Sequence, residues 1–367
     1  MPCDSKSSCG LVNVTLITSN YFLNTLKGEY VNVQPQLIEK IGLSPAEKLW
    51  EMAASDMAEV DSLIIERMQS PVGLIPDLAK HLISAGGKRL RPLLTVATSL
   101  MCGYEGNSHH KLAAAVEFIH SATLLHDDVV DDSALRRGKK PANLLWGNSP
   151  SILVGDFLFA RAFNLMVETN SMEALNILAN ASSIIAEGEV RQLASLGSMQ
   201  IDEESYMEVI SAKTAALFAA STEVSAVITS QSAKKRKALH DYGLKIGLAF
   251  QLVDDALDYS GFESKLGKSV GDDFREGKMT LPVIRSIEFS NHKNDNFWYR
   301  VIVEKKQKNE DFKKAVILIQ ESKALESTME LARKYSLEAK ELLDVFDASP
   351  WKTTLEELAS YIVERAS

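Results

Sequence analysis

Two copies of one acidic pattern, Asp-Asp-x-x-Asp, end two apolar helical stretches of the sequence. The first copy, at 127–131, follows Leu124 and Leu125, and the second, at 254–258, follows a run that begins at Phe250. Aspartates four residues apart on a helix share one face about 6 Å apart, where like charges repel unless a cation lies between them. The two helix ends could face each other across a bundle. The pattern therefore predicts an all-α fold around a site for cations and a polyanion.

The carboxylates of the two motifs are hard oxygen ligands of the kind that suits Mg²⁺. A single acidic helix end is more often a solvated surface feature, but a second copy on another helix favours a diphosphate site. We expect two or three Mg²⁺ ions, with Mn²⁺ as an alternative, and the metal ligands that we predict are Asp127, Asp131 and Asp254.

Clusters of Lys and Arg follow two of the predicted turns. In Gly86-Gly-Lys-Arg-Leu-Arg-Pro92, three cations lie beside a flexible backbone and before a predicted helix. Charge-assisted hydrogen bonds from such residues, with nearby helix-terminus amides, could hold a diphosphate. Arg136 and Arg137 follow Asp131 closely enough to reach diphosphates held at the metal, and guanidinium groups match phosphate oxygens bidentately.

The composition limits the other functions that a chain of this kind could have. The net charge is −9 and the pI is near 5.4, which argues against a general nucleic-acid binder. Three cysteines give neither an even disulfide framework nor metal-ligand spacing. No apolar run is long enough for a membrane span, and we recognise neither a signal peptide nor a mitochondrial presequence. We expect a cytoplasmic protein that contacts a membrane only transiently, when it releases product.

From roughly Leu43 to the C-terminus, the chain resembles the trans-isoprenyl diphosphate synthases. Both aspartate motifs, the basic segment 86–92, Lys213-Thr214 and the segment 271–282 occur in the order found in that family. The resemblance implies a large helical bundle with a central cavity and a homodimeric enzyme. It also implies that isopentenyl diphosphate reacts with an allylic diphosphate such as farnesyl or geranylgeranyl diphosphate.

The resemblance also implies the roles of individual residues. The catalytic set is Asp127, Asp128, Asp131, Asp254, Asp255, Asp258 and Lys213. The isopentenyl diphosphate set is Lys88, Arg91, His120 and Arg137. The allylic diphosphate set is Arg136, Lys213, Thr214, Gln251 and Lys268, for which Lys278 is a weaker match than Lys268. The polar residues around Glu189 and Gln192 are expected to support the site.

Residues just before the first motif set product length in this family, where short-chain members carry bulky aromatic side chains. Here Ala122 and Thr123 are small, so the resemblance predicts an open tunnel. Each helical turn adds about 5.4 Å of depth, roughly one isoprene unit. We therefore expect a long all-trans product of the octaprenyl to decaprenyl type, used for the ubiquinone side chain. A farnesyl or geranylgeranyl product is the alternative.

Three other functions are weighed against this one. A terpene cyclase shares the bundle and one aspartate motif, but its second motif typically mixes other residues. A non-catalytic synthase subunit usually lacks one motif, whereas both are intact here. A ferritin-like di-iron site needs two Glu-x-x-His motifs, and only Glu117-x-x-His120 is found.

The chain is predicted to form one catalytic domain at 36–367 after an N-terminal extension at 1–35. Spacing predicts helices over Pro45–Met68 and Leu78–Ala85, and near the C-terminus over 310–321, 324–346 and 354–366. The charged segment 289–309 is predicted to be a surface loop.

Overall fold

The computed structural model describes residues 43–84, 89–131, 139–260 and 271–364, and throughout these ranges the regular structure is helical, without a β-strand. The predicted all-α class is therefore confirmed. The first half contains α2 (Pro45–Met52), α3 (Ala54–Arg67), α4 (Leu74–Ser84), α5 (Leu90–Met101), α6 (Ser108–Val130), α7 (Ala142–Trp146), α8 (Asn148–Val167) and α9 (Met172–Ser195).

The second half begins with three elements that are close in sequence: α10 (Glu203–Ile210), the π-helical turn η2 (Ser211–Ala215) and α11 (Ala216–Ile228). The later elements are α12 (Ala233–Asp258), α13 (Asp272–Glu276), α14 (Leu281–Phe289), α15 (Asp295–Trp298), η3 (Tyr299–Val303), α16 (Asp311–Glu321), α17 (Ala324–Leu342), η4 (Leu343–Val345) and α18 (Pro350–Glu364).

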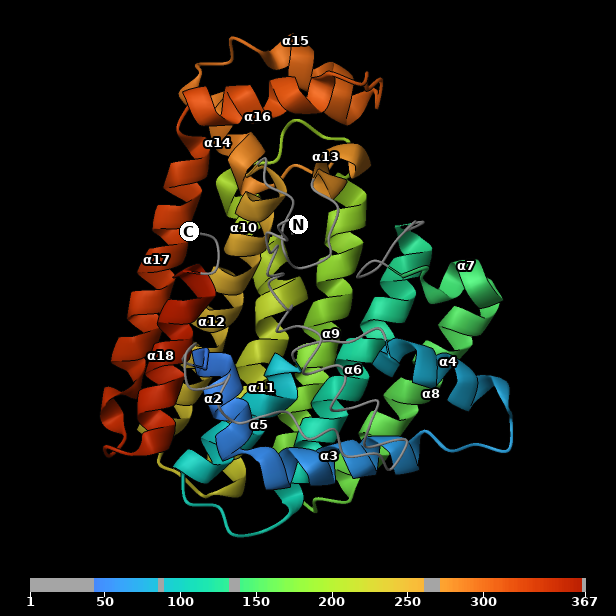
Figure 1. Ribbon diagram of the computed structural model, residues 1–367, viewed down its shortest axis with the longest axis vertical. Helices are drawn as coiled ribbons and strands as arrows, with labels where there is room; N and C mark the ends of the chain where they lie inside the picture. The colour runs from blue at the N-terminus through green and yellow to red at the C-terminus, as the bar shows by residue number, and fades with distance from the viewer. Residues whose placement is uncertain (1–42, 85–88, 132–138, 261–270, 365–367) are drawn as a thin grey trace, which may run out of the picture.

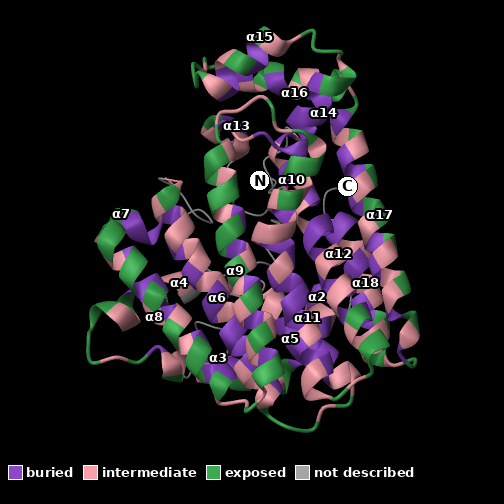
Figure 2. Cartoon of the chain, turned by 180° about the vertical axis from the view of Figure 1, so that it is seen from behind, coloured by how far each residue is buried: buried purple, intermediate pink, exposed green. Residues whose placement is uncertain are grey.

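The long helices α6, α9, α11 and α12 form the middle of the bundle, with α17 and α18 along one side and α8 along the other (Figure 1). α3 crosses the lower end in this view, and α16 crosses the upper end above α13 and α14. Buried residues concentrate where the central helices meet, while the outer faces are exposed (Figure 2). The C-terminal ends of α6 and α12, which carry the aspartate motifs, both lie in the upper half of Figure 1.

Two predicted helices differ from the observed ones in detail. The segment 45–68 is divided at Ala53 into α2 and α3, although the predicted N-terminus is confirmed because the Ser44 hydroxyl and the Glu47 side chain form a reciprocal capping box. The segment 324–346 ends as a short 3₁₀ turn, η4.

The prediction of a surface loop at 289–309 was wrong. This segment contains α15 and the π-helical η3, in which Trp298, Val301 and Ile302 are fully buried. These side chains join the apolar cluster that also contains Leu252, Val253 and Tyr259. The prediction gave weight to the flanking charged residues and overlooked a short apolar run, which packs against the C-terminal part of α12.

One helix in the described ranges, α8, is long and apolar enough to cross a membrane by length and composition, a property that the core helices of soluble proteins share. Of its most apolar stretch, 39% is buried in this structure, because α8 packs along α6. Its outer face carries exposed Leu153, Phe163 and Val167.

Candidate active site

The first aspartate motif ends α6, as predicted. Asp127 lies in the last turn, and Asp131 caps the helix with its N–H donating to the Asp127 carbonyl at 2.8 Å. Asp128 points into the protein and is 1% exposed, and its carbonyl accepts a hydrogen bond from Asn143 at 2.8 Å. The side chains of Asp127 and Asp131 are 15% and 22% exposed, so these two carboxylates are the ones that a ligand can reach.

Lys213 connects the first motif to the opposite side of the bundle. Its Nζ lies 3.8 Å from Asp127 Oδ2 and donates hydrogen bonds to Glu189 Oε2 at 2.7 Å and to Gln192 Oε1 at 3.0 Å. Lys213 lies in the π-helical turn η2 rather than in the regular helix that the sequence predicted. Such turns occur frequently at functional sites because they redirect side chains out of the helical register.

Lys278 provides a second connection, from the segment that follows α13. Its Nζ lies 3.5 Å from Asp131 Oδ2 and also pairs with Glu276. Burial alone would lower the pKa of Lys278, but the carboxylates of Asp273, Asp131 and Glu276 outweigh burial and raise the pKa above its ordinary value. The sequence ranked Lys278 below Lys268, which lies outside the described residues. Together with Lys213, Lys278 is placed beside the first motif.

The second aspartate motif ends α12, but its carboxylates have different surroundings. Asp255 is buried and accepts hydrogen bonds from the Tyr206 hydroxyl at 2.6 Å and from Gln251 Nε2 at 2.7 Å. Burial, together with the nearby Asp273 carboxylate, raises the pKa of Asp255 to about 8. Asp255 is therefore held as part of a hydrogen-bonded network, while Asp254, one residue earlier, is half-buried.

Asp258 binds the start of the loop segment that returns to the site. Its two carboxylate oxygens accept hydrogen bonds from three consecutive backbone N–H groups, those of Gly271, Asp272 and Asp273, at 3.0, 3.2 and 3.0 Å. Burial and then Asp273 raise the pKa of Asp258 to about 7, against the opposing effect of these N–H groups. The side chain thus fixes the segment that leads to Lys278.

A cleft lies between η2, α12 and the segment after α13. Its polar lining includes Lys213, Thr214, Gln251, Asp255, Asp273 and Lys278. The Thr214 hydroxyl donates to Gln251 Oε1 at 2.9 Å, which orients the amide so that its Nε2 faces Asp255. The structure therefore brings together Lys213, Thr214 and Gln251, three of the residues predicted to bind the allylic diphosphate.

Of the residues predicted to bind isopentenyl diphosphate, the structure describes Arg91 and His120. Arg91 Nη1 lies 3.4 Å from His120 Nε2, and the Arg91 guanidinium lies 4.2 Å from the centroid of the Phe218 ring, so these two predicted residues are neighbours. Arg89 turns inward and pairs with Asp61. Four predicted residues lie outside the described ranges: Lys88, Arg136, Arg137 and Lys268.

The two residues predicted to control product length lie one to two turns before Asp127 on α6. Ala122 is fully buried, and Thr123 is half-buried with its hydroxyl donating to the His120 carbonyl at 2.8 Å.

Three supporting residues were missed or given little weight by the sequence. Tyr206, on α10, contacts Asp255 although it lies far from both motifs in sequence, and nothing in the local pattern indicates this contact. Glu189 and Gln192 were predicted only as supporting residues, yet both accept hydrogen bonds from Lys213. A Glu-Gly-Glu interruption of an otherwise apolar helix was the available signal.

The donor set around the first motif suits a divalent hard cation. Burial, and then the charges of Asp127 and Asp131, raise the pKa of Glu189 above its ordinary value, although Lys213 opposes this effect. Three carboxylates thus concentrate negative charge that an additional cation would relieve. The groups facing one another here are carboxylate oxygens and ammonium groups, and oxygen is the ligand atom that Mg²⁺ prefers. The residues present therefore fit the magnesium that the sequence predicted.

Comparison with known proteins agrees with this geometry. The family model described as Polyprenyl synthetase matches residues 73–319. Octaprenyl diphosphate synthase of Escherichia coli (strain K12) is 42% identical over 319 residues, which cover 87% of this chain and 98% of that protein.

Two solved structures are also similar to this chain. A polyprenyl synthase from Caulobacter crescentus CB15, complexed with calcium and isoprenyl diphosphate, is 55% identical with a TM-score of 0.85, over 88% of this chain and 98% of that one. A decaprenyl diphosphate synthase from Rhodobacter capsulatus is 48% identical with a TM-score of 0.85, over 88% of this chain and 100% of that one. The chain therefore belongs to the polyprenyl synthetase family, and it is a prenyltransferase of the polyprenyl diphosphate synthase class.

Proposed function

We propose that this enzyme condenses isopentenyl diphosphate with an allylic diphosphate, farnesyl or geranylgeranyl diphosphate, to make a long all-trans polyprenyl diphosphate. The expected length is octaprenyl to decaprenyl, and the expected use is the side chain of ubiquinone. The observation that carries the proposal is the convergence of Lys213 and Lys278 on the two accessible carboxylates of the first motif. Lys213 and Lys278 also line the cleft that Gln251 and Asp255 border, so groups from distant parts of the chain meet there.

Asp127, Asp131 and Asp254 would hold the magnesium on which this family generally depends, and the bound metal would neutralise charge on the leaving diphosphate. Lys213 and Lys278 attract the diphosphate oxygens and become free to do so when the carboxylates take up cations. Thr214 and Gln251 orient the same group by hydrogen bonds. We assign Arg136 and Lys268 to this allylic diphosphate as well, following the sequence prediction.

In the reaction, the C–O bond between the allylic carbon and the diphosphate breaks, and the diphosphate leaves with the bonding electrons. The double bond of isopentenyl diphosphate then forms the new carbon–carbon bond to the allylic carbon. The released diphosphate then takes one proton from the condensed carbocation, which restores a double bond in the product. Arg91 and His120, with Lys88 and Arg137, would hold the diphosphate of isopentenyl diphosphate during this step. The protein contributes position, charge stabilisation and exclusion of water.

Product length is tested at Ala122, the fully buried small residue on α6. Ala122→Phe would block an elongating chain there, so we expect shorter products with condensation retained. Ala233→Phe, the same change at an exposed position at the start of α12, is the matched control and should leave product length unchanged. Equal product lengths in both variants would remove Ala122 from the tunnel wall.

The activity itself is tested with the purified full chain, radiolabelled isopentenyl diphosphate, farnesyl diphosphate and Mg²⁺. After dephosphorylation, thin-layer separation should show octaprenyl to decaprenyl alcohols, and chelation of the metal should abolish them. Products of geranylgeranyl or farnesyl size would support the shorter-chain alternative. A cyclic hydrocarbon would indicate a cyclase, and no product at all would indicate a non-catalytic subunit.

We further propose a homodimer that uses the outer face of α8. Leu153, Phe163 and Val167 are exposed on this face at spacings that place them along one side of the helix, and a second copy would cover them. Light scattering should give the mass of two chains, and Phe163→Asp should shift this mass toward that of one chain.

We assign residues 36–367 to a single catalytic domain. Cys102, a half-buried free thiol, fits a reducing compartment such as the cytoplasm.

A further inference from the structure

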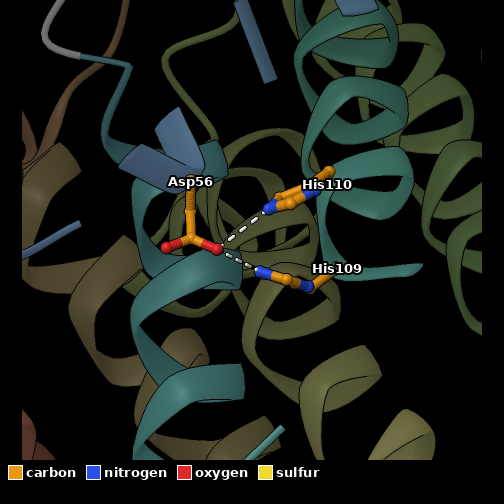
Figure 3. Close-up of side chains that lie close together, drawn as sticks. All are labelled: Asp56, His109 and His110. Atoms are coloured by element: carbon orange, nitrogen blue, oxygen red, sulfur yellow. Dashed lines mark hydrogen bonds and ion pairs between the residues drawn. The ribbon is translucent and has the colours of Figure 1, made fainter. Parts of the chain in front are cut away.

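A second cluster of metal-ligating side chains lies at the other end of α6, where that helix begins. Asp56 on α3 faces His109 and His110 in the first turn of α6 (Figure 3). His109 Nε2 lies 2.8 Å and His110 Nε2 2.9 Å from the same carboxylate oxygen, Asp56 Oδ1. Seventeen residues of helix separate His110 from Asp127, which corresponds to about 25 Å. This cluster is therefore distinct from the aspartate motifs.

Each of the two Nε2 atoms faces the Asp56 carboxylate and therefore carries a proton in this structure, which a bound metal would replace. Burial lowers the pKa of His109 below its ordinary value, although Asp56 opposes this effect. Burial raises the pKa of Asp56, but hydrogen bonds from His110 and His109 outweigh burial and lower the pKa below its ordinary value, so the carboxylate is ionised. Neutral imidazole and carboxylate are the protonation states in which these groups coordinate a metal.

The geometry of the cluster is already close to that of a coordination sphere. The ligand atoms of all three residues lie within 4.8 Å of one another. Metal–ligand distances of about 2.0–2.2 Å for imidazole nitrogen and carboxylate oxygen require only small movements from this arrangement. His109 is 2% exposed and packs edge-on against Tyr104, which fixes its ring, while the side chains of His110 and Asp56 are 18% and 26% exposed. Solvent can therefore supply a fourth ligand.

We propose that Asp56, His109 and His110 bind one transition-metal ion of the Zn²⁺ class and thereby tie α3 to the first turn of α6. Two imidazoles and one carboxylate, with an open fourth position, suit Zn²⁺ and its neighbours in the first row, whereas Mg²⁺ prefers oxygen ligands alone. The site is independent of the proposed prenyl transfer. Its role is to hold the two helices together from outside the active site.

The test uses the full chain, stripped of metal and then kept in saturating Mg²⁺ so that oxygen-only sites are filled. Titration with Co²⁺ should give the intense visible absorption of a four-coordinate ion with nitrogen ligands, with one equivalent bound. His110→Ala should weaken this binding by more than about 100-fold, since removing an outer-shell partner of a metal ligand alone costs about 10–100-fold. Asp56→Asn, which keeps the shape and one acceptor oxygen, should weaken it as well.

The matched control is His292→Ala, because His292 forms an exposed pair with Asp295 at 3.3 Å and, among the residues that the structure describes, belongs to no cluster of three metal-ligating side chains. This variant should bind Co²⁺ like the unchanged protein. Zn²⁺ should raise the melting temperature of the unchanged protein and of His292→Ala, but not that of His110→Ala. Absence of the cobalt spectrum in the unchanged protein, or an equal spectrum in His110→Ala, would overturn the proposal.

Discussion

The two aspartate motifs share one sequence pattern, yet the structure surrounds them differently. On α6, Asp127 and Asp131 are accessible and face the ammonium groups of Lys213 and Lys278. On α12, Asp255 is hydrogen-bonded to Tyr206 and Gln251, and Asp258 accepts from three backbone N–H groups. The comparison teaches that an aspartate in such a motif can serve either as a ligand or as a structural anchor. We infer that the first motif mainly binds cations and the second mainly builds the cleft.

The largest expected effect is that of Asp127→Ala. Loss of a metal-binding carboxylate removes several kcal/mol of charge stabilisation at the leaving group, so we expect kcat to fall by about 10³-fold or more. Because Lys213, which lies 3.8 Å from Asp127, keeps its hydrogen bonds to Glu189 and Gln192, the midpoint of urea unfolding should change little. Asp344→Ala, at an exposed carboxylate, is the control. Near-normal turnover in Asp127→Ala would contradict the assignment of the first motif.

For Asp258→Ala, in contrast to Asp127→Ala, we expect a large loss of stability and a smaller loss of activity. The variant leaves three backbone N–H groups without their acceptor, and hydrogen bonds to a charged group contribute about 1.5–3 kcal/mol each. We expect a stability loss of about 3 kcal/mol, less than the sum for three such bonds because burial of the carboxylate opposes them. We also expect a fall in kcat of about 10–100-fold, because the segment leading to Lys278 loses its anchor. Asp258→Asn keeps one acceptor oxygen and should lie between. If Asp258→Ala were as inactive as Asp127→Ala but as stable as the unchanged protein, the two motifs would not differ in role as inferred.

Tyr206→Phe should have a smaller effect. The change removes the 2.6 Å hydrogen bond to Asp255 and leaves the carboxylate with Gln251 as a partner. We expect about 1–3 kcal/mol less stability and only a few-fold lower kcat, measured by urea denaturation and steady-state kinetics. Tyr361→Phe, at a half-buried tyrosine on α18, is the control for loss of a hydroxyl. A kcat loss near that of Asp127→Ala would instead give Tyr206 a direct role in catalysis.

The sequence did not predict that the two aspartate motifs have different surroundings, although it did predict which residues belong to the candidate site. The two motifs, Lys213, Thr214, Gln251, Arg91 and His120 were all predicted, and the all-α fold followed from the same helical periodicity. One contact that distinguishes the motifs comes from Tyr206, which is distant in sequence and carries no local signal. The other comes from the backbone at 271–273, where the resemblance pointed to the segment but not to its hydrogen bonds with Asp258. The π-helical turn that contains Lys213 was not predicted either, because the pattern of its residues is that of an ordinary α-helix.

A further prediction concerns the pH dependence of stability and needs no effect on kcat. Burial raises the pKa of Asp255 to about 8, whereas an unfolded aspartate has a pKa near 3.9. Between these values the folded chain binds a proton that the unfolded chain has released, so stability of the ligand-free protein falls as pH rises from about 4 to about 8. Urea unfolding at about pH 5.5 and about pH 8, two values within this window, should show the difference. Asp255→Asn should reduce the slope, and an unchanged slope would contradict the buried state of Asp255.

The most direct test of the account is to locate the metal ions. A crystal structure of the full chain with Mn²⁺ and a non-hydrolysable allylic diphosphate analogue, with anomalous scattering recorded at the manganese edge, would show which carboxylates bind them. We predict ions on Asp127, Asp131 and Asp254 around one diphosphate, with Asp258 still bonded to the backbone at 271–273. Ions on Asp255 or Asp258, or a diphosphate held away from α6, would contradict it.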